Sequence, residues 1–141
     1  MYDDILFPTD GSEAAERTFP HAVSQARAFD ARIHLLYVVN TMHAGVGVAG
    51  DTNINALRES GESVLEEFEA KLGAEDIETV TAIEDGDPFT EIKRYSDEHV
   101  DMIVMGTRGR SGLDKYLLGS VTEKVVRTAD VPVFTVRSPE E

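Results

Sequence analysis

The 141 residues, 41% of them hydrophobic, suffice for one domain with a sizeable core and are too few for two domains of ordinary size. The 27 acidic and 13 basic residues give a formal charge of -14, which argues against nucleic acids and anionic membranes as partners because both require a basic surface. The absence of cysteine excludes disulfides, zinc-thiolate sites and thiol catalysis.

The first half of the chain alternates strand and helix patterns. Ile5-Leu6-Phe7 predicts a short strand that ends at the turn 8–12. Apolar residues then recur at helical spacing to Phe29, and Pro20 inside this helix predicts a kink or a shifted first turn. Residues 33–39 predict a second strand, and a helical stripe from Ile54 to Leu72 is expected to close at Gly73.

The second half continues the alternation. Residues 78–84 alternate weakly like a strand, and Asp87-Pro88 predicts the cap and first turn of a helix that includes Tyr95. Residues 102–105 form a buried-strand pattern. A helix is expected over 120–128, and a last strand runs from Val131 to Arg137.

This order predicts an α/β fold: a single doubly wound, parallel five-stranded sheet, order 3-2-1-4-5, with helices on both faces. We assign the domain to residues 1–138 and a solvated tail to 139–141. In such sheets the ligand lies beyond the carboxyl ends of the strands, where the winding direction reverses. Strands one and four flank that crevice, so the loop at Asp10 and the loop at Gly106 should face one another.

The loop after the fourth strand has the composition of a phosphate site. Glycines at Gly106, Gly109 and Gly119 let backbone amides converge on an anion, and we expect the helix beginning near Ser120 to add its free amides. Ser120 and Thr122 would then offer hydroxyl donors at the helix start.

Three basic residues lie in the same loop, Arg108, Arg110 and Lys115, in a chain otherwise dominated by carboxylates. One hypothesis is that Arg108 or Arg110 contacts the γ-phosphate of a bound nucleotide. The alternative is a solvated loop charge, or a pair with Asp114.

With these glycines the chain resembles the universal stress proteins, in particular their ATP-binding branch. The signature of that branch is Gly, two residues, Gly, nine residues, then Gly and Ser or Thr, which Gly106, Gly109, Gly119 and Ser120 fit. The resemblance extends over nearly the whole chain, because the segments 5–12, 35–38, 86–88 and 131–136 are similar to the family's strands and turns.

The resemblance implies bound ATP, with Mg²⁺ or Mn²⁺ carried by its phosphates rather than by a protein metal site. Asp10 and the Val38 backbone would hold the adenosine end, Gly106 and Gly109 would approach the ribose and phosphates, and the run from Gly119 to Thr122 would take the phosphates. A simpler alternative for Asp10 is a helix N-cap. The full set of expected nucleotide-binding residues is Pro8, Thr9, Asp10, Val38, Met105, Gly106, Arg108, Gly109, Gly119, Ser120, Val121 and Thr122.

The resemblance also implies a homodimer formed through the strand Val131 to Arg137, whereas in a monomer Val133 and Phe134 would simply fill the core. No apolar run reaches the roughly 18 residues of a membrane span, and the N-terminus lacks the basic flank of a secretory signal. We therefore expect a cytoplasmic protein that contacts neither membranes nor nucleic acid. The acidic surplus suits a salt-rich cytoplasm, in which screening weakens self-repulsion.

Together these features favour an ATP-binding universal stress protein that acts as a nucleotide-dependent switch in the stress response. A Walker-type Gly-Lys-Ser/Thr ending is absent and no base for activating water is evident, so efficient hydrolysis is not indicated and no catalytic residue is assigned. A slow ATPase or phosphotransferase, and a protein-interaction module without ATP dependence, remain alternatives.

Other motifs carry less weight. The G-x-G-x-x-G pattern at 45–50 does not follow a strand directly, so we interpret 41–52 as a small-residue loop instead of a dinucleotide fingerprint. A phosphoacceptor receiver is excluded because Asp3-Asp4 precede the first strand and Arg137 stands where that fold needs lysine. The histidines lack metal-ligand spacing, and His34, inside a strand, is expected to be structural.

Overall fold

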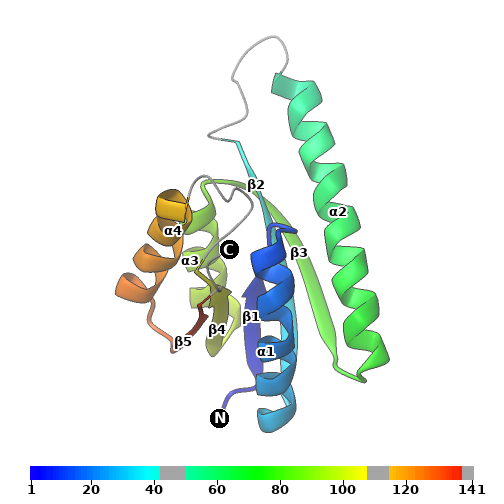
Figure 1. Ribbon diagram of the computed structural model, residues 1–141, viewed down its shortest axis with the longest axis vertical. Helices are drawn as coiled ribbons and strands as arrows, with labels where there is room; N and C mark the ends of the chain where they lie inside the picture. Colours follow the sequence, from blue (N-terminus) through cyan, green and yellow to red (C-terminus); the bar gives the residue numbers. More distant parts are fainter. Residues whose placement is uncertain (42–49, 108–114, 138–141) are drawn as a thin grey trace.

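The computed structural model describes residues 1–41, 50–107 and 115–137, and the tail assigned to 139–141 lies outside them. Strands and helices alternate along the chain, and all five strands pair in parallel in the order β3-β2-β1-β4-β5, which confirms the predicted fold class (Figure 1). The elements are β1 (Asp4–Pro8), α1 (Glu13–Phe29), β2 (Arg32–Asn40), α2 (Gly50–Ala74), β3 (Thr79–Gly86), α3 (Pro88–His99), β4 (Met102–Gly106), α4 (Lys115–Thr128) and β5 (Val133–Val136).

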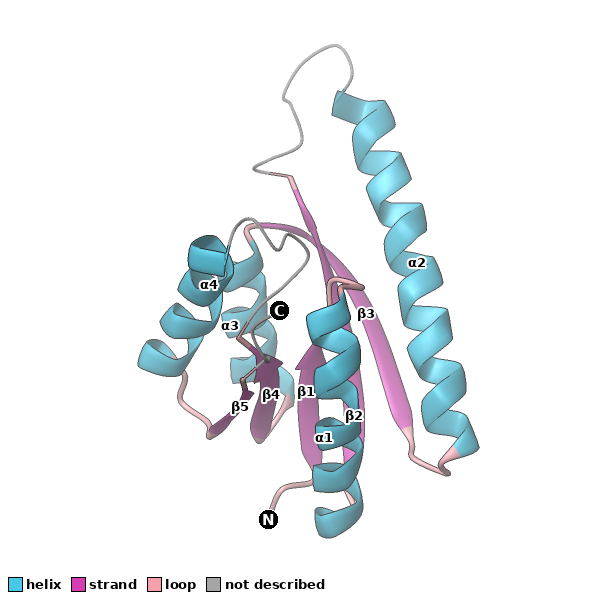
Figure 2. Ribbon diagram, viewed as in Figure 1, coloured by secondary structure: helices cyan, strands magenta, loops and turns pink. Residues whose placement is uncertain are grey.

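The four helices cover the sheet on two faces, with α1 and α2 on one side and α3 and α4 on the other (Figure 2). Neighbouring residues of the central strands therefore point into different cores: Ile5 and Phe7 face α1 and α2, whereas Leu6 faces α3 and α4. Because both faces are covered, β1 and β2 are apolar almost throughout instead of alternating with polar residues.

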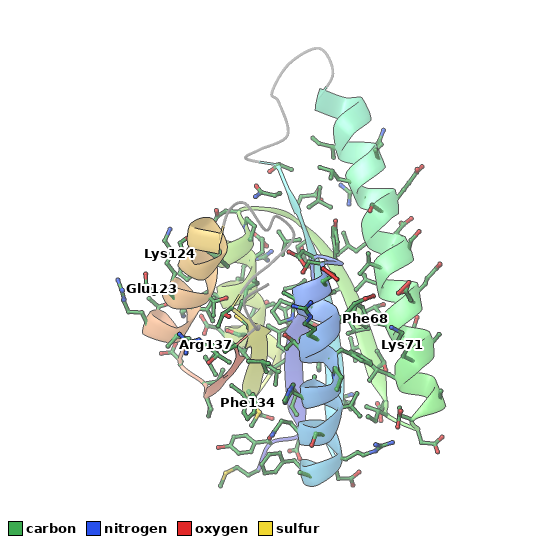
Figure 3. All side chains as sticks on the ribbon, viewed as in Figure 1. Phe68, Lys71, Glu123, Lys124, Phe134 and Arg137 are labelled. Carbon is green, nitrogen blue, oxygen red and sulfur yellow. The ribbon has the colours of Figure 1, made fainter. Side chains whose placement is uncertain are left out.

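Three phenylalanines join the sheet to its first two helices. Phe7 of β1, Phe19 of α1 and Phe68 of α2 have ring centroids between 4.8 and 5.9 Å apart. The Lys71 ammonium lies 5.3 Å from the Phe68 ring centroid, and both side chains lie between α2 and α1 (Figure 3). Burial of these aromatic rings and their edge-on contacts hold α1 and α2 against the same face.

Several local expectations are confirmed and others are wrong. Asp87 caps α3 by accepting from the Thr90 amide, with Pro88 at the first helical position, as expected. Gly73 does not end α2, which continues to Ala74, and the left-handed residue of the following turn is Asp76. α1 includes Pro20 within Glu13–Phe29, and the kink expected there stays a prediction. The last strand is shorter than the expected 131–137.

The expected structural role of His34 is confirmed at the amino end of the sheet. Its Nε2 lies 2.8 Å from Asp4 Oδ1 and its Nδ1 lies 2.7 Å from the Tyr95 hydroxyl. The Asp4 carboxylate can only accept, so His34 donates from Nε2, and in the neutral ring Tyr95 donates to Nδ1. Arg32 also donates to Asp4 Oδ1, and this network connects β1, β2 and α3.

The network changes the acidity of two of its members. Partial burial opposes ionisation of Asp4, but the hydrogen bonds from His34 and Arg32 outweigh it and hold the pKa of Asp4 below its ordinary value. Burial, reinforced by the negative charges of Glu84 and Asp4, raises the pKa of Tyr95. Both shifts favour the charged Asp4 and the neutral Tyr95 that the hydrogen bonds require.

These interactions predict a pH-dependent contribution of Asp4 to stability. Because its pKa is lower in the folded protein than in the unfolded chain, that contribution is complete above the ordinary value of 3.8 and is lost as the pH falls through the lowered value. We expect Asp4→Asn to lower the free energy of unfolding by about 1 kcal/mol or more at pH 5, as for hydrogen bonds to a charged group. The gap to the wild type should shrink towards pH 2 in urea titrations. Asp3→Asn makes the same chemical change at the neighbouring exposed carboxylate and serves as the control. A gap for Asp4→Asn that stays constant into acid would contradict the assignment.

Candidate functional site

The turn between β1 and α1 is fixed by hydrogen bonds within itself and to β2. The Thr9 amide donates to the Leu36 carbonyl at 2.9 Å, so the end of β1 stays in register with β2. The Gly11 amide donates to Thr9 Oγ1 at 3.2 Å, and the Ser12 amide donates to Asp10 Oδ1 at 3.0 Å. These bonds hold the half-buried Asp10 carboxylate at the carboxyl end of the central strand.

Asp10 is not the cap of α1. That role belongs to Ser12, whose hydroxyl accepts from the Ala15 amide at 3.2 Å. Asp10 lies two residues earlier and closes the turn that leads into Ser12, a bond that a short carboxylate makes readily. The capping alternative for Asp10 is therefore wrong.

On the neighbouring strand, the end of β4 is fixed from two sides. The Thr107 amide donates to the Val136 carbonyl of β5 at 3.1 Å. The Gly106 carbonyl accepts from the Thr122 hydroxyl of α4 at 2.9 Å. Thr122 is buried, so its single proton is committed to this contact between helix and strand. The position at which the chain leaves β4 is thus set by α4 and β5 together.

The expectation that a helix begins at Ser120 is wrong. α4 begins at Lys115, so Ser120 and Thr122 lie inside the helix and its unpaired amides belong to earlier residues. Residues 115–118 are acceptable helix formers, and a glycine at 119 costs only about 1 kcal/mol in a helix interior, which is too little to stop it.

The fold brings these two segments together, as the sheet order predicts. β1 and β4 are adjacent and parallel, with Leu6 opposite Ile103, so Asp10 and Gly106 follow neighbouring strands at the same edge (Figure 1). Val38 lies in β2 at that edge and packs into the core beneath α3 and α4.

The predicted site residues fall into three groups. Pro8, Thr9, Asp10, Val38, Met105 and Gly106 gather at this edge, and Thr122 joins them through its bond to Gly106. Gly119, Ser120 and Val121 lie in α4. The rest of the glycine loop, including Arg108, Gly109 and Arg110, lies outside the described residues, as does most of the 45–50 glycine pattern, whose last residue, Gly50, opens α2.

Residues 1–41, 50–107 and 115–137 contain no group of three or more histidine or carboxylate side chains placed to hold a metal ion. Within the same ranges, no helix is long and apolar enough to cross a membrane. The residues at the carboxyl edge instead offer one carboxylate, hydroxyls and backbone groups, a donor and acceptor set suited to a polar organic ligand.

Comparison with known proteins agrees with this geometry. The model of the universal stress protein family matches residues 1–137. The chain belongs to this family. It is 33% identical to universal stress protein MJ0531 of Methanocaldococcus jannaschii, over 100% of this chain and 85% of that protein. A universal stress protein of Methanothermobacter thermautotrophicus is 35% identical, over 98% of this chain and 97% of the relative.

Two solved structures of the family share the fold over nearly their full length. Protein MJ0577 of Methanocaldococcus jannaschii superposes with a TM-score of 0.90 at 32% identity, covering 100% of this chain and 99% of that one. A universal stress protein UspA from Lactobacillus plantarum gives 0.85 at 27% identity, covering 96% and 98% of the two chains. The doubly wound sheet of this chain is therefore the fold of its family.

The contact between Thr122 and Gly106 predicts a loss of stability in Thr122→Val. Valine keeps the branched shape of threonine but leaves the Gly106 carbonyl without this donor, so we expect a loss of about 1 kcal/mol in urea unfolding. Thr128→Val is a matched control, because its hydroxyl bonds within α4 to the Lys124 carbonyl and its side chain is exposed. Equal effects of the two substitutions would mean that the bond to Gly106 contributes nothing specific.

Proposed function

We propose that this universal stress protein binds ATP at the carboxyl edge of β1, β2 and β4, and that the bound nucleotide controls its conformation or choice of partner in the stress response. The observation that carries the proposal is the adjacency of Asp10 and Gly106, which are far apart in sequence and lie at the ends of neighbouring parallel strands. Gly106 begins the glycine signature that resembles the ATP-binding branch of the family.

The chemistry of the edge supports an adenosine ligand. The Asp10 carboxylate, held by the Ser12 amide, can accept from ribose hydroxyls or from an adenine amine. Glycines at 106, 109 and 119 allow the backbone to approach a polyphosphate, and Arg108 or Arg110 would supply the positive charge that such an anion needs. Mg²⁺ or Mn²⁺ would accompany the phosphates.

Two further structures support nucleotides as the ligand class. One is a universal stress protein in complex with cAMP, with a TM-score of 0.74 at 23% identity. The other is a family protein from Arabidopsis thaliana with AMP bound, with a TM-score of 0.72 at 21% identity. For this chain these likenesses establish the fold alone, and the nucleotide remains our proposal.

We further propose that the protein acts in the cytoplasm as a homodimer formed through β5. β5 is an edge strand, paired on one side with β4, and its Phe134 side chain is 38% exposed instead of filling the core (Figure 3). An edge of this kind can pair with a second copy.

Calorimetric titration of nucleotide-stripped protein with ATP and Mg²⁺ at high salt tests the binding, and we expect saturable uptake. Asp10→Asn should weaken ATP about 10- to 100-fold, the scale of hydrogen bonds to a charged group. Asp76→Asn serves as a control, because Asp76 lies in the turn before β3, at the opposite edge of the sheet, and asparagine tolerates its left-handed backbone. No binding by the wild type would overturn the proposal in favour of a protein-interaction module.

A further inference from the structure

At Gly61, helix α2 lies so close to Tyr37 of β2 that a residue with a side chain would not fit there. A Cβ atom placed on Gly61 would lie 2.5 Å from Tyr37 Cδ1 and 3.0 Å from Tyr37 Cγ. The Tyr37 side chain is 3% exposed and packed in the core under α1 and α2, so its ring has little room to withdraw. Tyr37 immediately precedes Val38, whose backbone is assigned to adenosine.

One turn later, α2 contacts the turn between β1 and α1, which carries Asp10. Val64 lies over Gly11, where an added Cβ would come within 2.8 Å of Val64 Cγ2. Gly11 has a φ of +77°, which suits glycine, and it directly follows Asp10. Phe68, one further turn along, points to the same side of α2 and anchors it among the core phenylalanines (Figure 3).

A polar contact fixes the same stretch of helix to the sheet. Arg58 Nη2 lies 2.6 Å from Asp85 Oδ2, and Asp85 pairs in register with Val39 at the end of β2. Both side chains are about half exposed, so this ion pair adds little to the stability of the protein and serves mainly to orient α2 on the sheet. The depth of α2 is thus set mainly by the contacts of Gly61 and Val64.

We propose that Gly61 and Val64 are positioning residues for the adenosine half of the site. Gly61 sets how far α2 descends onto β2, and Val64 then holds the turn that carries Asp10, so one face of α2 fixes the spacing between Asp10 and the Val38 backbone. This inference rests on the proposed ATP binding and deepens it. Neither residue has any role in the phosphate half, which depends on β4 and α4.

The chain provides a control glycine in the same helix. A Cβ placed on Gly73 has no atom within 4 Å beyond its chain neighbours and the helix backbone, and Gly73 lies in the last turn of α2. Alanine is a better helix former than glycine at both positions. Only Gly61→Ala must displace Tyr37 or lift α2 from the sheet.

The test compares adenosine with ATP in calorimetric titrations of the full chain. For Gly61→Ala we expect both affinities to fall by the same factor, about tenfold, the scale of one disturbed hydrogen bond to a carboxylate. The ratio of the two affinities, which measures the phosphate contribution, should stay at the wild-type value. Gly73→Ala should leave both affinities unchanged.

Two further variants keep the test decisive if Gly61→Ala folds poorly. Val64→Ala removes the contact to Gly11 without any clash and should show the same parallel loss of adenosine and ATP. Adding Tyr37→Leu to Gly61→Ala makes room for the new methyl group and should restore part of the lost affinity.

The outcomes separate the inference from the function on which it rests. Unchanged adenosine affinity in Gly61→Ala and Val64→Ala, or loss of ATP affinity alone, would overturn the positioning role while leaving ATP binding intact. If the wild type binds neither ligand, the proposed function itself fails.

Discussion

The parallel pairing of β1 with β4 is the constraint on which the site depends. Because β1 lies in the middle of the sheet, the chain must reverse its winding direction there, and β1 and β4 end side by side. Covering helices prevent any slip of register, because a shift by one residue would turn Ile5 and Leu6 towards the wrong cores. This strand pairing places Asp10 and Gly106 at the same end of the sheet.

The polar groups at the amino ends of the strands differ in role from those at the carboxyl ends. At the amino edge, His34, Asp4 and Tyr95 satisfy one another in a closed network, which leaves that end structural. At the carboxyl edge, the described polar groups fix backbone: Thr9 binds the Gly11 amide, Asp10 the Ser12 amide and Thr122 the Gly106 carbonyl. These bonds make the edge rigid before any ligand arrives, which lowers the ordering cost of binding one.

The net negative charge of the protein opposes binding of the proposed polyphosphate ligand. The protein carries a formal charge of -14, so its overall field repels an anion. Several described cations are engaged by carboxylates, as in the pairs Arg58 with Asp85 and Lys93 with Asp97. Local attraction at the glycine loop, with Arg108 and Arg110, and screening by salt and a divalent cation would have to overcome the remaining field.

The sequence by itself determined the order of strands and helices, the sheet order and the family. Apolar periodicity and glycine spacing are patterns among residues close in sequence, so they can be recognised without the tertiary structure. It also determined which segments should meet, since parallel βα units leave few possible topologies. It misplaced the start of α4, and its alternative role for Asp10, the cap of α1, belongs to Ser12. At both places several residues could serve, and contacts with neighbouring elements decide among them. Only the tertiary structure decided that Thr122 bonds to Gly106, and that Gly61 and Val64 of α2 lie against Tyr37 and Gly11. These contacts join residues far apart in the sequence, and no sequence pattern indicates that they meet.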